Sequence, residues 1–202
     1  MIAVINYGMG NLRSVQKAFE RIGIPIIITS SVPEIMKADK LVLPGVGHFA
    51  NGMKNLKEMG LQEALNEKVM VQKVPILGIC LGMQLFTGSS EEGNVEGLGW
   101  IKASTRKFVF PDGSLKIPHM GWNSVIVVKE SPLLDRCLPE DLFYFVHSYY
   151  VDCRNPSDIL LKTEYGITFT SSFQSGNIFG TQFHPEKSHR PGLNLLKNFV
   201  NL

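Results

Sequence analysis

Residues Val74–Gly82, with the sequence VPILGICLG, join a short apolar run to a cysteine that has glycines on both sides. The apolar part, Val74–Ile79, has the length and composition of a buried β-strand. Cys80 follows this strand directly, and the residues after it begin a predicted helix. Units in which a strand leads into a helix build parallel sheets that carry helices on both faces.

The chain before this segment also alternates between strands and helices. Predicted strands occupy Ile2–Ile5, Pro25–Thr29 and Leu41–Leu43. Apolar residues recur at helical spacing between and after them, at Leu12, Val15, Phe19 and Ile22, then at Phe49, Met53 and Leu56, and then at Leu61, Ala64, Leu65 and Val69. We therefore predict an α/β fold in which helices flank a mostly parallel central sheet.

The second half of the chain has a different pattern. Runs rich in Val, Ile, Phe, Tyr and Thr lie near residues 100–109, 124–128, 142–153, 158–163, 167–174 and 177–183. Runs of this kind separated by turn signals predict an additional antiparallel β layer. A final helix is expected over Leu193–Val200. Without repeats or a long linker, residues 1–202 are predicted to form a single domain.

Composition excludes several classes of protein. The 202 residues carry 20 basic and 18 acidic side chains, so the formal net charge is +2, and no nucleic acid or anionic membrane is expected as partner. No stretch approaches the roughly 20 apolar residues of a membrane span, and the N-terminus lacks a signal-peptide pattern. Cys80, Cys137 and Cys153 lie far apart without metal-ligand spacing. We therefore expect a reduced, cytoplasmic protein without a metal site.

Cys80 has the context of a nucleophile. Gly78–Gly82 matches the nucleophile-elbow pattern with cysteine in place of serine. A sharp turn from strand to helix strains the backbone, and the flanking glycines allow close approach of neighbouring chains. The helix N-terminus favours a thiolate, and the amide of Leu81 is expected to face a tetrahedral oxyanion. The alternative is an inert, buried cysteine in a glycine-rich turn.

A thiol nucleophile requires a base, usually a histidine, and a group that orients this base. His184 ends the apolar run Ile178–Phe183, where Pro185 stops the strand. Glu186, two residues further on, is placed to bond one imidazole nitrogen. The alternatives are that His184 bonds only local backbone, or that His147, which also follows an apolar run, is the base.

The other histidines and cysteines lack such a context. We place His119 in a turn beside an aromatic residue. Structural, pocket-lining or loop roles are expected for His48, His119, His147 and His189, and Cys137 and Cys153 are interpreted as inert thiols.

Five segments together resemble the class I glutamine amidotransferases. Gly78–Gln84 is similar to the nucleophile motif of this family, Phe183–Glu186 to its His-x-Glu motif and Pro44–Gly47 to its oxyanion-strand motif. Tyr7–Leu12 and Pro118–Asn123 narrow the resemblance to the glutaminase subunits of imidazole glycerol phosphate synthases, from histidine biosynthesis. The segments occur in the family's order over nearly the whole chain.

The resemblance implies a reaction at the side-chain amide of glutamine. The Cys80 thiolate would attack the amide carbon, His184 would pass the thiol proton to the departing ammonia, and Glu186 would orient His184. Water would then hydrolyse the γ-glutamyl thioester to glutamate. No metal or organic cofactor is implied.

The resemblance also implies roles for residues around the nucleophile. The Val46 amide would turn toward the oxyanion that Leu81 also binds, and Gly45 and Gly47 make this backbone able to turn because glycine tolerates positive φ. Substrate contacts are implied for Gln84, Glu92, Ser148 and Tyr149. The alternative for Glu92 is a solvated loop carboxylate.

The sequence has no P-loop, no GxGxxG and no other sign of an acceptor site. A glutaminase of this kind passes its ammonia to another chain, and the resemblance implies a (β/α)₈-barrel cyclase subunit in a heterodimer. Interface candidates are Asn11, Trp122 and Lys187. The alternative for Trp122 is a position in the core.

The sequence is also compatible with two other functions. A paralogous glutaminase subunit would supply ammonia to a surface-polysaccharide sugar. A stand-alone cysteine hydrolase would act without any partner, but Gln84 and the turn around Trp122 argue against it.

Overall fold

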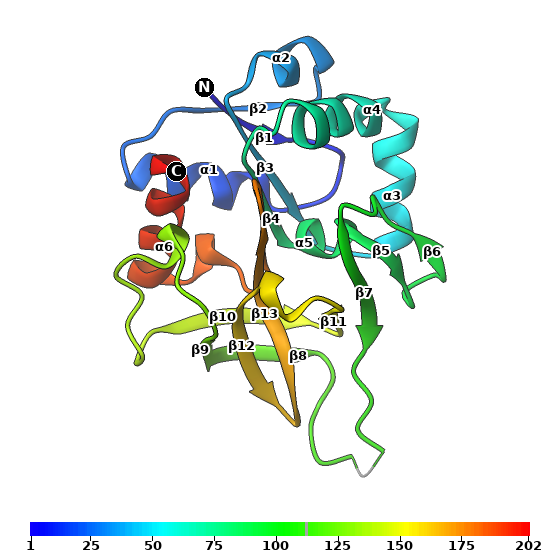
Figure 1. Cartoon of the computed structure of the whole chain (residues 1–202), viewed down its shortest axis with the longest axis vertical. Coiled ribbons are helices and arrows are strands. Elements are labelled where there is room, and N and C mark those ends of the chain that lie inside the picture. Colours follow the sequence, from blue (N-terminus) through cyan, green and yellow to red (C-terminus); the bar gives the residue numbers. More distant parts are fainter. Residues whose placement is uncertain (112) are drawn as a thin grey trace.

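The computed structural model describes residues 1–111 and 113–202. Five parallel strands form the first part of its main sheet, in the spatial order β2-β1-β3-β4-β14. Their bounds are Ile26–Thr29 for β2, Ile2–Ile5 for β1, Lys40–Gly45 for β3, Ile76–Cys80 for β4 and Ile178–Thr181 for β14. Figure 1 shows helices on either side of these strands, so the predicted parallel sheet with flanking helices is confirmed.

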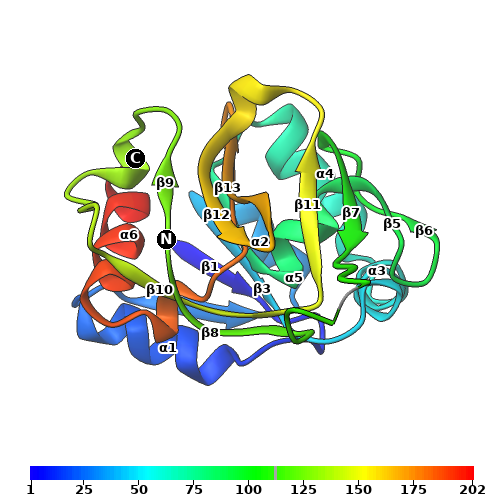
Figure 2. The same cartoon turned by 90° about the horizontal axis from the view of Figure 1, so that it is seen from below.

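Each face of the parallel strands has its own apolar cluster, because alternate side chains of a strand point to opposite faces. Ala3 and Ile5 belong to one cluster, and Ile2 and Val4 belong to the other. The first face is covered by α2 (Val32–Lys37), α3 (Phe49–Glu58), α4 (Leu61–Asn66) and α5 (Leu81–Leu85), and the second by α1 (Leu12–Arg21) and α6 (His189–Asn201). Figure 2 shows α1 and α6 together on one side of the molecule and α3 and α4 on the other.

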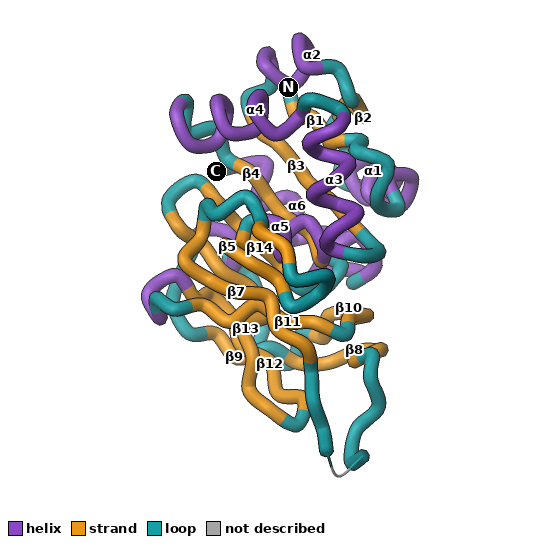
Figure 3. Tube along the Cα trace, turned by 90° about the vertical axis from the view of Figure 1, so that its right-hand side faces the viewer, coloured by secondary structure: helices purple, strands orange, loops and turns teal. Residues whose placement is uncertain are grey.

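The sheet continues beyond β14 through strands that are mostly antiparallel. The order is β14-β13-β11-β7-β5-β6, and β12 lies off this path between β13 and β9. Their bounds are Ile167–Ser175 for β13, Tyr149–Cys153 for β11, Ile101–Lys107 for β7, Thr87–Ser90 for β5, Val95–Glu96 for β6, Ile159–Tyr165 for β12 and Ile126–Val127 for β9. Figure 3 shows these strands below the parallel part. The predicted antiparallel part therefore largely extends the parallel sheet.

Two further strands form a small separate sheet. β8 (His119–Ser124) and β10 (Leu142–His147) pair antiparallel, and His119 lies directly opposite His147. The prediction that His119 lies in a turn was wrong, because this pairing draws it into a strand. The run predicted near 142–153 divides at Ser148, where the chain passes from the small sheet to the main sheet.

Several boundaries differ from the expected ones. α6 begins at His189 instead of Leu193, since Pro191 is tolerated in the first turn of a helix. α4 continues into a π-helical turn, η1 (Glu67–Val71), and short 3₁₀ turns occupy η2 (Pro132–Leu134), η3 (Pro156–Asp158) and η4 (Pro185–Lys187). In the described part of the chain, no helix has the length and apolar character needed to cross a membrane.

Candidate active site

Cys80 is the last residue of β4 and immediately precedes α5. Its backbone has φ 53° and ψ −108°, a conformation that non-glycine residues rarely adopt. A Cβ atom at Gly82 would lie 1.7 Å from the Leu43 carbonyl oxygen, and one at Gly78 would lie 2.7 Å from the Met83 nitrogen. Both flanking glycines are therefore required by the packing of this turn.

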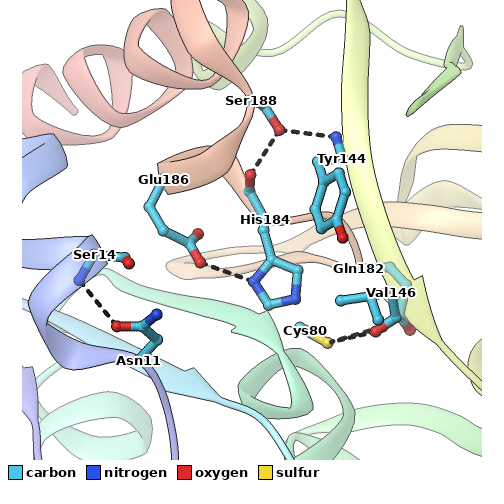
Figure 4. Close-up of polar contacts among 9 residues, drawn as sticks. All are labelled: Asn11, Ser14, Cys80, Tyr144, Val146, Gln182, His184, Glu186 and Ser188. Carbon is cyan, nitrogen blue, oxygen red and sulfur yellow. Dashed lines mark hydrogen bonds and ion pairs between the residues drawn. The ribbon is translucent and has the colours of Figure 1, made fainter. Parts of the chain in front are cut away.

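His184 and Glu186 form a buried pair just beyond β14, where His184 directly precedes η4 and Glu186 lies within it. His184 Nδ1 lies 2.8 Å from Glu186 Oε1, and the two side chains are 2% and 3% exposed. Since an ionised carboxylate only accepts hydrogen bonds, Nδ1 carries the proton. Nε2 is then the atom left for proton transfer, and it has no hydrogen-bond partner among the described residues. Figure 4 shows the His184 ring between Glu186 and Cys80.

Backbone contacts hold His184 in place. Its amide donates to the Tyr144 carbonyl at 2.9 Å, which ties the residue to β10. The buried Ser188 hydroxyl donates to the His184 carbonyl at 2.6 Å and accepts from the Tyr144 amide at 3.0 Å. The position of the imidazole is therefore fixed from two elements.

Opposing effects act on the pKa of His184. Burial of the ring disfavours the imidazolium and lowers the pKa, whereas the negative charge of Cys80, contact with its sulfur and the bond to Glu186 raise it. The net result is a pKa of about 10, so the ring is an imidazolium at neutral pH when the thiolate is present. Cys80 Sγ also lies 3.9 Å from the Val146 carbonyl oxygen, which is a second possible acceptor for the thiol hydrogen.

A cavity of about 360 Å³ opens on Cys80. Most of the residues expected around the nucleophile line it, namely Val46, Gly47, Leu81, Gln84, Glu92, Ser148 and Tyr149, together with Pro118, Val146 and His147. A larger cavity of about 710 Å³, between Val127 and the C-terminal end of α6, contains none of them. The smaller cavity is therefore the candidate site.

The oxyanion-strand segment enters this cavity from β3. Gly45 pairs with Cys80 in the parallel register of β3 and β4, so Val46 and Gly47 follow directly beside the cysteine. Val46 is 40% exposed, and Gly47 has φ 108°. The positive φ requires glycine at position 47, where a Cβ atom would also lie 2.9 Å from Met9 Cε.

Two expected substrate residues have partners of their own. The Gln84 amide nitrogen donates to the Tyr149 carbonyl at 3.0 Å and to Gln182 Oε1 at 3.1 Å. Glu92 is half-buried, and its Oε2 accepts a hydrogen bond from the Phe49 amide at the start of α3 at 2.7 Å. This bond ties the Glu92 side chain to the start of α3.

His147, the rival base, is buried with both ring nitrogens occupied. Nδ1 lies 2.8 Å from the Tyr149 carbonyl oxygen, and Nε2 lies 3.0 Å from Nδ1 of the buried His119. Burial lowers the pKa of His147 to about 3, against the effect of its bond to Tyr149, and lowers that of His119 to about 4. His147 cannot accept the thiol proton without losing a partner, whereas Nε2 of His184 is unoccupied.

The three interface candidates lie away from the cavity. Trp122 is 45% exposed on β8 and stacks on His189 with ring centroids 4.9 Å apart, so a core position is excluded. Lys187 Nζ lies 5.5 Å from the centre of the Tyr144 ring. Asn11 caps α1 by accepting from the Ser14 amide at 3.2 Å, a role that was not predicted.

Two buried polar residues at the site were missed from the sequence. Gln182 is fully buried, and its Nε2 lies 3.7 Å from Cys80 Sγ. The hydroxyl of the buried Tyr7 has no hydrogen-bond partner among the described residues and faces Gly45. A glutamine inside the apolar run Ile178–Phe183 was a usable signal, because uncharged polar residues are seldom fully buried.

The sequence model described as "Glutamine amidotransferase class-I" matches residues 3–202. The chain belongs to the class-I glutamine amidotransferase family. The family resemblance expected from the five segments is thereby confirmed.

Three relatives of this amidotransferase carry the name "Imidazole glycerol phosphate synthase subunit HisH", which in two of them is followed by a numeral. HisH 2 of Methanococcus maripaludis is 53% identical over 99% of this chain and 98% of its own length. HisH 1 of Campylobacter jejuni (strain RM1221) is 54% identical, and HisH of Leptospira interrogans is 41% identical, each over the full length of both chains.

Solved structures show the amidotransferase fold. A structure described as "Crystal structure of glutamine amidotransferase" matches with a TM-score of 0.76 at 16% identity, covering 99% of this chain and 100% of the other. The PurLQS structure from Thermotoga maritima matches with a TM-score of 0.71 at 16% identity, covering 99% and 97%. Within residues 1–111 and 113–202 of this amidotransferase, no group of three or more His, Cys, Asp or Glu side chains is placed to hold a metal ion.

Proposed function

We propose that this amidotransferase is the glutaminase subunit of an imidazole glycerol phosphate synthase and hydrolyses glutamine to glutamate and ammonia. The observation that carries the chemistry is the thiol of Cys80, on a strained backbone turn, beside the His184 imidazole, which the buried carboxylate of Glu186 orients. The names of the full-length relatives support the assignment to this synthase.

In the proposed reaction, Cys80 Sγ attacks the side-chain amide carbon of glutamine. His184 holds the proton from the thiol and delivers it to the leaving nitrogen, so ammonia departs and a γ-glutamyl thioester forms. Water then attacks the thioester with His184 as base, which releases glutamate and restores the thiol. Glu186 keeps the imidazole in the Nδ1–H tautomer throughout.

The proposed oxyanion hole combines two backbone amides. Leu81 supplies one at the start of α5, and the peptide before Val46 supplies the other when its N–H turns toward the cavity. Loss of one such donor costs a factor of roughly 10²–10³ in kcat. A turn of this single peptide is therefore enough to switch the enzyme between nearly inactive and active states.

The walls of the 360 Å³ cavity are the proposed binding site for the rest of glutamine. Glu92 is the carboxylate that lines it and is placed to pair with the substrate ammonium. Ser148 and Tyr149 offer backbone and ring edges from the junction between β10 and β11, and Gln84 lines the cavity from α5 beside Tyr149.

The ammonia acceptor is proposed to be a (β/α)₈-barrel cyclase subunit bound in a heterodimer. Trp122 is the proposed anchor, because exposed aromatic residues dominate interface energies. Asn11 and Lys187 are the proposed polar contacts. All three cysteines of the chain are free thiols, which fits the proposed cytoplasmic location.

The test is steady-state glutaminase kinetics on the purified chain alone, with the cyclase subunit, and with the cyclase subunit and its nucleotide substrate. The chain alone should be nearly inactive, and the complete mixture should raise kcat by roughly 10²–10³, the effect of one oxyanion donor. Equal kcat in all three conditions would support a stand-alone hydrolase. Activation only by a sugar-modifying synthase would support the paralogous function.

A further inference from the structure

The backbone carbonyl of Tyr149 accepts two hydrogen bonds inside the site. His147 Nδ1 lies 2.8 Å from this oxygen, and Gln84 Nε2 lies 3.0 Å from it. A carbonyl oxygen can only accept, so Nδ1 of His147 must carry its proton and Gln84 must present its NH₂ end. One oxygen atom therefore fixes the orientation of both side chains.

From Gln84 the hydrogen bonds lead to the nucleophile. The second N–H of Gln84 Nε2 donates to Gln182 Oε1 at 3.1 Å. Gln182 must then turn its own NH₂ group away from Gln84, and this nitrogen lies 3.7 Å from Cys80 Sγ. Because Gln182 is fully buried and Gln84 is 4% exposed, water does not compete for these bonds.

From His147 a second set of hydrogen bonds holds the same carbonyl in place. His147 Nε2 has no proton and accepts from His119 Nδ1 at 3.0 Å, so His119 Nε2 accepts from the Asn123 side-chain amide at 3.3 Å. The Asn123 side chain is independently oriented, since its oxygen accepts from the Ser124 amide at 2.8 Å. The lowered pKa values keep both histidines neutral, which this arrangement requires.

The hydrogen bonds of Cys80 Sγ change in strength when the thiol ionises. As a thiol, it donates to the Val146 carbonyl and accepts from Gln182. As a thiolate, it has no proton to donate to Val146, whereas the bond from Gln182 becomes charge-assisted and stronger. Gln182 therefore favours the ionised form of the sulfur over the neutral one.

The other titratable groups around Cys80 play different parts. His184, backed by Glu186, supplies the positive charge. His147 is neutral, Tyr7 is held neutral because burial and then the charge of Cys80 raise its pKa, and Glu92 lines the same cavity as a carboxylate. Gln182 is thus the neutral side chain that donates to the sulfur.

We propose that Gln182 is a further catalytic residue, which donates a hydrogen bond to Cys80 Sγ and holds the sulfur as a thiolate. Gln84 is its positioning residue, and the Tyr149 carbonyl with the His147–His119–Asn123 chain orients Gln84. This inference rests on the proposed function, in which Cys80 is the nucleophile.

The test is the pH dependence of Cys80 alkylation by iodoacetamide, followed by mass spectrometry of the Cys80 peptide from the full chain. Gln182→Met keeps the side-chain volume and removes the donor. The midpoint of its rate–pH curve should move up by about one pH unit, the tenfold effect of losing one hydrogen bond to a charged atom. Gln174→Met, the same change on β13, is the matched control and should leave the curve unchanged.

A second variant keeps the test decisive if Gln182→Met does not fold, and circular dichroism shows whether each variant is folded. Gln182→Glu keeps the shape and the oxygen that accepts from Gln84, but turns a second oxygen toward the sulfur. Its midpoint should also move up. A folded variant of either kind with the wild-type midpoint would overturn the role of Gln182. Alkylation needs no glutamine, so a failure of the proposed function would appear separately, as absent glutaminase activity in the wild-type complex.

Discussion

Gly45 and Cys80 are direct partners in the parallel pairing of β3 and β4. A Cβ atom at position 45 would lie 2.2 Å from the Tyr7 hydroxyl and 2.9 Å from Leu81 Cβ, so only glycine fits there. Val46 and Gly47 therefore leave β3 at the point where Cys80, the proposed nucleophile, ends β4. A peptide turn after Gly45 would act within reach of the Cys80 sulfur.

The first prediction separates the two candidate bases. His184→Asn should lower kcat almost as far as removal of the thiol, on the order of 10⁴-fold or more, because members of a triad act as a unit. Glu186→Gln should lower it less, since Glu186 only orients the ring. His147→Asn is the comparison in the same assay of the partner complex, and a larger loss there than in His184→Asn would mean that the base is His147.

The charge on His184 gives a prediction about pH. Burial lowers the pKa of His184, whereas the negative charge of Cys80, contact with its sulfur and the bonded Glu186 together raise it to about 10. In Cys80→Ala this attraction is absent, so the pKa of His184 should fall and the ring should lose its proton at a lower pH. NMR titration of histidine-labelled protein measures this directly. Cys153→Ala is the control, and a His184 titration that is the same in both variants would rule out the thiolate–imidazolium pair.

The buried neutral histidines predict a loss of stability in acid. The pKa values of His119 and His147 lie at about 4 and about 3, below the value of 6.5 for a free histidine, chiefly because of burial. The unfolded chain therefore binds more protons, and the free energy of unfolding should fall as the pH drops from 6.5 toward these values. The urea midpoint should fall between pH 7 and pH 5, and fall less in His119→Gln. His48 is exposed at the start of α3, so His48→Gln is the control and its urea midpoint should fall as far as that of the wild type. If the midpoint of His119→Gln also falls that far, the assignment of His119 as a buried neutral histidine is contradicted.

The parallel core could be predicted from the sequence because its signals are local. The run Val74–Ile79, the glycines around Cys80 and the Pro185 stop after His184 each specify a short segment without reference to the rest of the chain. The boundaries of these strands were accordingly correct to within about two residues.

The remaining features depend on pairing between distant segments. His119 was placed in a turn beside an aromatic residue, yet its antiparallel pairing with His147 makes it part of a strand. Gln182 was missed because its contact with Cys80 joins residues 102 positions apart. Asn11 was expected only as a contact with the partner subunit, and its role as the N-cap of α1 was missed. Such contacts follow from sheet order and register, which short motifs do not specify.

The most direct measurement is glutamate release by Cys80→Ala in the complete partner complex, beside the same complex supplied with an ammonium salt. Only a small side chain changes, so the cost in stability should be on the order of 1 kcal/mol and the fold should persist. Glutamine hydrolysis should be abolished, while the ammonium-dependent reaction of the partner should continue at the wild-type rate, since that chemistry needs no thiol. Glutamine-dependent turnover by clean Cys80→Ala protein would contradict the assignment of Cys80 as the nucleophile.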